Sequence, residues 1–158
     1  RQGPYIGDRA VTARIMAQLE QAEAVGKPAF VMAVTMENHG PLHLEQVSPN
    51  ESSRYHAFGE GGRLNDLAAY LRHLANADSM IGDWLEYLQR RSRPSIICFY
   101  GDHVPALPDL CARRGKPQSV TDYFIWHSKA ATGSHRRNLN AYELGAALVQ
   151  ASASPSSL

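Results

Sequence analysis

The sequence has few cysteines, no long apolar run and no excess of one charge. Its two cysteines, Cys98 and Cys111, exclude a disulfide framework and a Cys-x-x-Cys metal site, and they leave the redox compartment open. Because 16 Lys and Arg stand against 15 Asp and Glu, the charge balance does not indicate a nucleic acid or an anionic membrane as the main partner. The apolar runs are well short of the roughly 20 residues that a membrane helix needs.

The start of the sequence lacks an initiator methionine and the layout of a signal peptide. It reads like the middle of a longer protein, so we expect an excised fragment that is itself soluble. With 158 residues the chain has the length of one domain, and we expect a single globular unit. Residues 152–158 have the composition of a disordered tail.

Apolar residues recur with the periods of helices and strands. Helical spacing after Asp8, a candidate N-cap, predicts a helix that ends at Gly26. The nearly continuous apolar run at 29–35 predicts a strand with helices on both faces of its sheet. Residues 36–62 lack periodicity, which is typical of a long loop that is functional or mobile.

The second half of the chain continues this alternation. An apolar stripe along 64–88 predicts a long amphipathic helix, and strands are predicted at 95–100 and 121–128. Asn140 can cap a final helix. The order of helix, strand, helix, strand, strand, helix indicates an α/β fold, a three-layer α/β/α sandwich with a mostly parallel sheet.

Two strand ends carry chemically useful side chains. Asp102 and His103 follow the predicted strand at 95–100 after one glycine, and carboxylate oxygen and imidazole nitrogen are ligands that zinc or manganese favours. Glu37 to His43 follow the strand at 29–35. In an open α/β sheet, ligands bind at the carboxyl ends of the strands, so the two ends predict one metal or catalytic site. The alternative is that Asp102 and His103 are ordinary surface residues.

Asn38, His39 and His43 are the candidates at the second strand end. An imidazole titrates near neutral pH, so His39 can be a donor or an acid/base group beside a substrate, with Asn38 and His43 as substrate-binding residues. The alternative is a turn in which the histidine is incidental, and His43 is equally compatible with either interpretation. Glu37 could be a ligand or a strand-end acid, and we favour the strand-end acid. We interpret His73, like several other histidines, as an ordinary surface or packing residue.

These residues resemble the sulfatase-like branch of the alkaline phosphatase superfamily. The resemblance includes lipoteichoic acid synthase, phosphoglycerol and phosphoethanolamine transferases, and sulfatase-like capsular polysaccharide biosynthesis proteins. The matching stretches cover most of the chain in the family's order, and the strand ending in Gly-Asp-His is the most specific one. They are residues 35–41, 74–78, 81–83, 99–103 and, less closely, 121–125.

The resemblance implies a role for each matching position. Asp102 and His103 match two metal ligands of such a catalytic domain, and His39 matches the histidine beside the substrate's phosphate or sulfate group. The nucleophile and the remaining acidic ligand of the family belong to an earlier part of the domain, which we do not find here. Cys111 is not in the cysteine pattern of true sulfatases and is no candidate nucleophile. The fragment alone is therefore expected to be inactive.

The resemblance also implies what the intact protein does. Residues 1–151 would be the C-terminal portion of a metal-dependent phosphoryl- or sulfuryl-group transferase or hydrolase in capsular polysaccharide biosynthesis. A divalent metal, manganese or zinc, and a phosphate- or sulfate-bearing envelope glycan or lipid would be its cofactor and substrate. Its place would be the outer face of the inner membrane. The rivals are a non-catalytic α/β scaffold domain and a self-sufficient hydrolase that uses only His39, Asp102 and His103.

Overall fold

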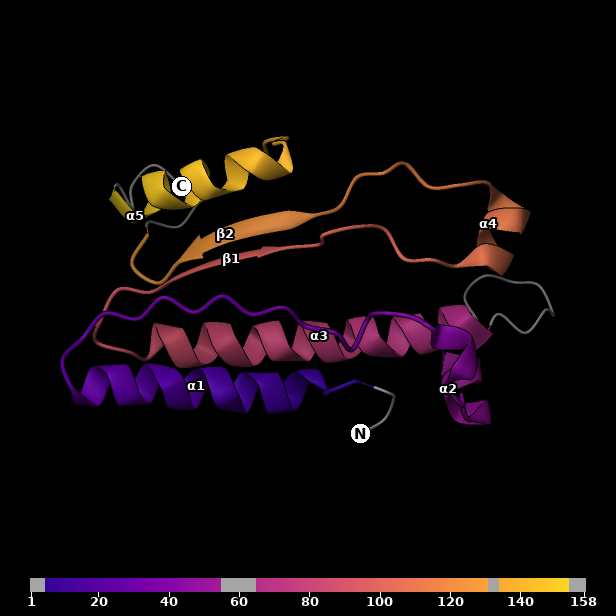
Figure 1. Cartoon of the computed structure of the whole chain (residues 1–158), viewed down its shortest axis with the longest axis horizontal. Coiled ribbons are helices and arrows are strands. Elements are labelled where there is room, and N and C mark those ends of the chain that lie inside the picture. Colours follow the sequence, from indigo (N-terminus) through magenta and orange to yellow (C-terminus); the bar gives the residue numbers. More distant parts are fainter. Residues whose placement is uncertain (1–4, 55–64, 131–133, 154–158) are drawn as a thin grey trace. The chain divides into compact units, whose positions relative to one another are not determined.

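The computed structural model describes residues 5–54, 65–130 and 134–153 (Figure 1). The chain separates into two compact units, whereas its length led us to expect a single globular unit. Unit 1 comprises Arg1–Asp83 and Pro105–Pro117, and unit 2 comprises Trp84–Val104 and Gln118–Leu158. Within the described residues, no helix is both long enough and apolar enough to cross a membrane.

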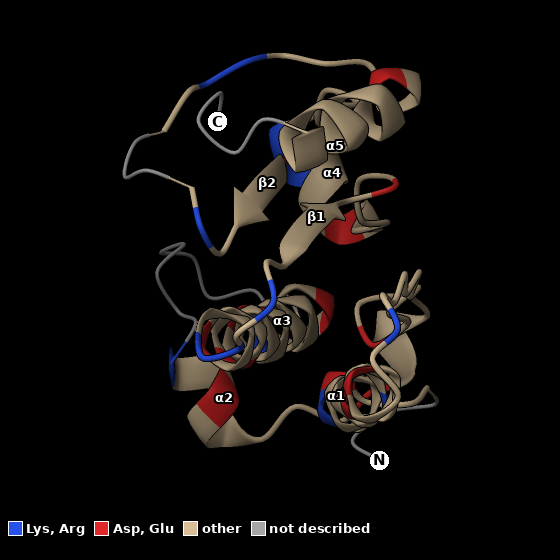
Figure 2. Ribbon diagram, turned by 90° about the vertical axis from the view of Figure 1, so that its left-hand side faces the viewer, with Lys and Arg blue, Asp and Glu red and all other residues tan. Residues whose placement is uncertain are grey.

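Unit 1 is built on helix α1 (Asp8–Ala24) and most of helix α3 (Asn65–Gln89), which lie alongside each other in Figures 1 and 2. Both helices were predicted. Gly7, and not Asp8, is the N-cap of α1, so Asp8 is the first helical residue. The helix ends at Ala24, two residues before the predicted stop at Gly26, whose φ of 70° favours glycine over residues with a Cβ atom.

The predicted strand at 29–35 is not formed. Among the described residues, the backbone of this segment forms no β-ladder with another strand. The side chains of Phe30, Met32 and Val34, which stand at alternate positions, are 83%, 74% and 67% exposed. Residues two apart lie on the same face of an extended chain, so the segment carries an apolar face that the described residues leave uncovered. A strand requires a neighbour for its backbone N–H and C=O groups, and no described strand pairs with this segment.

The loop at 36–54 contains a 3-10 helix, η1 (Leu42–Leu44), and helix α2 (Pro49–Arg54); residues 55–62 of the predicted loop lie outside the described part. Leu42 is buried against Leu67 and Ala69 of α3 and against Leu107, which precedes helix α4 (Pro108–Arg114). This cluster forms the core of unit 1 and fixes the middle of the loop.

Unit 2 contains strands β1 (Ile96–Tyr100) and β2 (Tyr123–His127), as predicted, but they pair antiparallel. Phe99 lies opposite Phe124, and their rings stack with centroids 5.7 Å apart. The described residues thus combine helices and strands, as an α/β fold requires, with a small antiparallel sheet where a mostly parallel one was predicted.

Helix α5 (Leu144–Ala153) lies against both strands of this sheet and contains no charged residue (Figure 2). Asn140 caps the 3-10 helix η2 (Ala141–Glu143) that leads into it, in a capping box with Glu143. Ser152 and Ala153, which were predicted to begin the tail, are the last residues of α5, and the rest of the tail lies outside the described residues.

Candidate functional site

The backbone that follows β1 is fixed by contacts between Gly101 and the start of β2. The Gly101 N–H donates to the carbonyl oxygen of Asp122 at 3.1 Å, and the Thr121 hydroxyl donates to the Gly101 carbonyl oxygen at 2.6 Å. A Cβ atom at position 101 would lie only 3.2 Å from Cβ of Thr121. The close approach of Thr121 therefore favours glycine here, and it sets the direction in which Asp102 and His103 leave the sheet.

Asp102 and His103 have the geometry of two ligands to one cation. Oδ2 of Asp102 lies 3.7 Å from Nε2 of His103, and two ligand atoms of a tetrahedral zinc ion are about 3.4 Å apart. Nδ1 of His103 lies 3.0 Å from the Val104 carbonyl oxygen, which can only accept. The proton of the neutral ring is thus on Nδ1, and Nε2 carries the lone pair that a metal needs.

The side chains of Asp102 and His103 are 75% and 61% exposed, so further ligands can reach a cation between them. A carboxylate and an imidazole suit zinc and manganese, so the donor set fits the divalent metal that the resemblance implies. Among residues 5–54, 65–130 and 134–153, no three His, Cys, Asp or Glu side chains form a group that could hold a metal ion.

His39 is held by the N-terminal segment and by its own loop. Its Nδ1 lies 2.7 Å from the Gly40 carbonyl oxygen, and the Tyr5 hydroxyl donates to the same oxygen at 2.9 Å. The rings of Tyr5 and His39 meet edge to face, with centroids 5.6 Å apart. Because a carbonyl oxygen only accepts, Nδ1 carries the proton, and Nε2 is the acceptor of the neutral ring.

The two other candidates on this loop differ in their surroundings. Asn38 is half-buried, and its Oδ1 is buried without a hydrogen-bond partner in the described part of the chain. His43 lies on η1 and is exposed. Both belong to unit 1 with His39, whereas Asp102 and His103 belong to unit 2. A common site formed by residues of both units stays a prediction.

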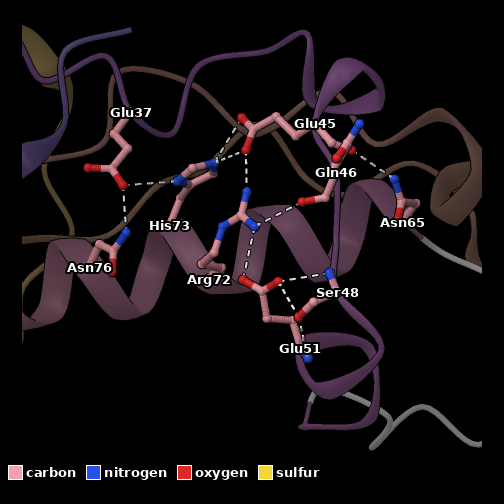
Figure 3. Close-up of polar contacts among 9 residues, drawn as sticks. All are labelled: Glu37, Glu45, Gln46, Ser48, Glu51, Asn65, Arg72, His73 and Asn76. Carbon is pink, nitrogen blue, oxygen red and sulfur yellow. Dashed lines mark hydrogen bonds and ion pairs between the residues drawn. The ribbon is translucent and has the colours of Figure 1, made fainter. Parts of the chain in front are cut away.

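Below this loop lies a buried ionic cluster that the sequence did not reveal (Figure 3). His73 of α3 is 1% exposed; its Nδ1 lies 3.2 Å from Oε1 of Glu37, and its Nε2 lies 2.8 Å from Oε2 of Glu45. Glu37, which we interpreted as a strand-end acid, is thus part of this cluster. The sequence offered one sign that His73 is buried, namely its position on the helix. It lies four residues from both Ala69 and Ala77, on the buried face of α3.

Arginine extends the cluster toward α2. Arg72 contacts the carboxylate of Glu45, and its Nη1 donates to Oε1 of Glu51 at 2.9 Å. Glu51 in turn accepts hydrogen bonds from the side chain and backbone of Ser48. The hydrogen bonds from Ser48 and Arg72 lower the pKa of Glu51 to about 2, so this carboxylate is ionised at neutral pH.

At the end of the cluster near helix α1, the pKa values of two neighbouring carboxyl groups are shifted in opposite directions. Burial and the neighbouring Glu37 raise the pKa of Asp8 to about 6, although His73 lowers it. Burial also acts to raise the pKa of Glu37, but hydrogen bonds from the Asp8 backbone, Asn76 and His73 outweigh it and hold that pKa below its ordinary value. Two carboxyl groups that lie close together therefore differ in their affinity for protons.

Comparison with known proteins identifies the class. Residues 1–151 match the family described as Sulfatase, so the chain belongs to the sulfatase family, and the resemblance drawn from the motifs is confirmed. No solved structure matches the chain.

Two curated relatives from Rhizobium meliloti (strain 1021) are similar to this chain. The capsular polysaccharide biosynthesis protein RkpI is 29% identical over 136 residues, which are 85% of this chain and 22% of RkpI. A protein named for cyclic beta-1,2-glucan modification is 28% identical over 121 residues, which are 77% of this chain and 18% of that protein. The chain thus spans about a fifth of the length of these relatives.

Proposed function

We propose that this chain is part of a metal-dependent enzyme that transfers or hydrolyses a phosphoryl or sulfuryl group on a cell-envelope polysaccharide or its lipid-linked form. The observation that carries the proposal is the pair of Asp102 and His103, whose ligand atoms lie 3.7 Å apart directly after β1. Membership of the sulfatase family and the likeness to a protein of capsular polysaccharide biosynthesis support it.

In this proposal Asp102 and His103 hold one divalent cation, manganese or zinc, together with ligands from an earlier part of the protein. When bound, the cation supplies polarisation of a hydroxyl nucleophile and stabilises the charge that develops on the ester oxygens. The contact between Nδ1 of His103 and the Val104 carbonyl oxygen keeps Nε2 as the ligand atom.

His39 acts on the substrate in this proposal. The Gly40 carbonyl oxygen holds the proton of the neutral ring on Nδ1, so Nε2 is the atom that exchanges protons. When Nε2 is also protonated, it donates a hydrogen bond to the oxyanion or gives its proton to the leaving oxygen. Asn38 and His43 bind the phosphate- or sulfate-bearing sugar or lipid beside it.

The rest of the catalytic domain is also part of the proposal. Residues 1–151 are its C-terminal portion, and the upstream half supplies the nucleophile, the remaining ligands and strands that pair with residues 29–35. The uncovered side chains of Phe30, Met32 and Val34 support this pairing. The completed sheet would be the centre of a three-layer sandwich at the outer face of the inner membrane.

Metal analysis of the full-length protein tests the assignment. Asp102→Asn and His103→Gln each remove one ligand, so bound manganese or zinc and turnover of phosphate or sulfate esters should both fall by at least about tenfold. Asp109→Asn and His135→Gln, which change exposed residues of the same types, should leave both unchanged. Equal metal content and activity in all five proteins would refute the assignment.

The rival proposal is a non-catalytic scaffold domain that retains the fold only. It predicts that the full-length wild-type protein turns over neither class of ester, whatever metal it binds. Turnover by residues 1–158 alone would instead indicate a self-sufficient hydrolase, because no part of the upstream half is then present.

A further inference from the structure

His73 lies between two carboxylates in a position where both ring nitrogens must donate. Nδ1 lies 3.2 Å from Oε1 of Glu37, and Nε2 lies 2.9 Å and 2.8 Å from the two carboxylate oxygens of Glu45 (Figure 3). A neutral imidazole has one donor and one lone pair. One of these contacts would then set the lone pair of the ring against that of a carboxylate, with the ring only 1% exposed to water.

An imidazolium removes this conflict, because it donates from both nitrogens. A positive ring that is buried between two carboxylates is also paired on each side, whereas removal of the ring would leave no cation between Glu37 and Glu45, and only Glu45 would keep a charged partner, Arg72. The contacts therefore favour a cluster that retains one more proton than a neutral histidine would carry.

The two carboxylates are the two ends of one loop segment. Glu37 and Glu45 bracket residues 38–44, the stretch that contains His39, and both reach the same ring on α3. Within the segment, buried Leu42 adds an apolar anchor. We propose that His73, as an imidazolium, is a positioning residue that clamps both ends of this segment and thereby holds His39 in its working place.

The positioning role of His73 rests on the proposed function of His39. The contacts of His73 with Glu37 and Glu45, which form the clamp, do not depend on that function. Charged groups from each element around His73 contribute to it. Asp8 of α1 donates its backbone N–H to Glu37, and Arg72 of α3 contacts Glu45 and connects it to Glu51 of α2. The carboxyl group of Asp8 and the charge of His73 also act on each other, so Asp8 titrates within the same cluster.

One substitution separates this clamp from ordinary packing. In Glu37→Gln, the new amide can donate one N–H to Nδ1 and the other to Asn76, whose own amide turns so that its oxygen accepts. The neutral ring then donates from Nε2 to Glu45, so the cluster no longer needs the extra proton. His73→Gln removes the positive charge, and both N–H donors of its amide are on one nitrogen, so it cannot replace the two ring nitrogens that face Glu37 and Glu45. His135→Gln, at an exposed histidine, is the matched control.

Hydrogen–deuterium exchange of peptides from residues 36–48, measured in the full-length protein from pH 6 to 9, tests the clamp without any need for activity. After correction for intrinsic exchange, the wild-type protein should exchange faster at pH 9 than at pH 6, because a neutral ring can donate to only one of the two carboxylates. His73→Gln should exchange at least about tenfold faster at every pH, and Glu37→Gln should stay slow with no rise. The clamp would be overturned if His73→Gln exchanged at the wild-type rate, or if Glu37→Gln showed the same pH dependence as the wild type. If His73→Gln fails to fold, the comparison of Glu37→Gln with the wild type decides.

Kinetics then tests the positioning of His39. His73→Gln should lower kcat by about tenfold or more with bound metal unchanged, and Glu37→Gln should restore kcat at high pH relative to the wild type. Faster exchange at 36–48 with an unchanged kcat would overturn the positioning role. Loss of metal in Asp102→Asn and inactivity of the wild-type protein concern the proposed function and leave the exchange result intact.

Discussion

The backbone N–H of Asp8 donates a hydrogen bond to the carboxylate of Glu37, while the carboxyl group of Asp8 is itself buried with no hydrogen-bond partner in the described part of the chain. Burial, together with the nearby charge of Glu37, raises the pKa of the Asp8 carboxyl to about 6 from 3.8. The folded state therefore binds this proton more tightly than the unfolded state does.

The sign of the pH dependence follows from this difference. The contribution of Asp8 is fully present below pH 3.8 and is lost as the pH rises to about 6, at a cost of about 3 kcal/mol in the free energy of unfolding. Asp8→Asn removes the charge, and it loses only about 0.3–1 kcal/mol of favourable interaction with the start of the helix. The substitution should therefore stabilise the protein above pH 6.

Urea denaturation of wild type and Asp8→Asn at several pH values measures this effect. The advantage of Asp8→Asn should grow between pH 4 and 6 and then stay constant, and exposed Asp109→Asn should show no such trend. A constant difference between wild type and Asp8→Asn from pH 4 to 8 would show that the Asp8 carboxyl does not titrate in this range.

Gly101 gives a prediction about the backbone that carries the metal ligands. Gly101→Ala places a Cβ atom 3.2 Å from Cβ of Thr121, so the turn must move, with an expected loss of about 1–3 kcal/mol in stability and weaker metal binding. Gly82→Ala is the control, because a Cβ there meets nothing within 4 Å and α3 should gain about 0.5–1 kcal/mol. Metal titration and thermal denaturation of the full-length variants measure both. Equal behaviour of the two variants would contradict the close contact with Thr121.

The segment at 29–35 gives a prediction about the rest of the protein. Val34 is 67% exposed here and Val120 is 70% exposed, so both valines should tolerate aspartate equally if each faces water in the full-length protein. If a strand of the upstream half covers the segment, Val34→Asp buries an unpaired charge and should lower the melting temperature by several degrees more than Val120→Asp. Equal melting temperatures would argue against the proposed sheet.

Local patterns predicted the elements whose causes are local. The period of α3, the two strands of unit 2 and the cap at Asn140 depend on residues within a few positions, and the structure contains all of them. The motif after β1 led to Asp102 and His103, whose ligand atoms lie 3.7 Å apart, and their role as metal ligands stays a prediction.

The features that were not predicted depend on distant residues. Residues 29–35 have the composition of a strand, yet a strand forms only with a partner, and the direction of pairing between β1 and β2 is not set by the period of either. His73 was interpreted as an ordinary surface or packing residue, and its partners, Glu37 and Glu45, lie 36 and 28 positions away. A single histidine on an apolar helix face gives no local sign of such partners.

The central claim is that His103 ligates a divalent cation in the full-length protein. Pulsed electron paramagnetic resonance of the manganese-loaded protein measures this directly, because an imidazole ligand couples its nitrogen nucleus to the metal electrons. We predict a nitrogen coupling in the wild type and in His135→Gln that is lost in His103→Gln. A coupling that persists unchanged in His103→Gln, or bound manganese without any nitrogen coupling in the wild type, would contradict the account.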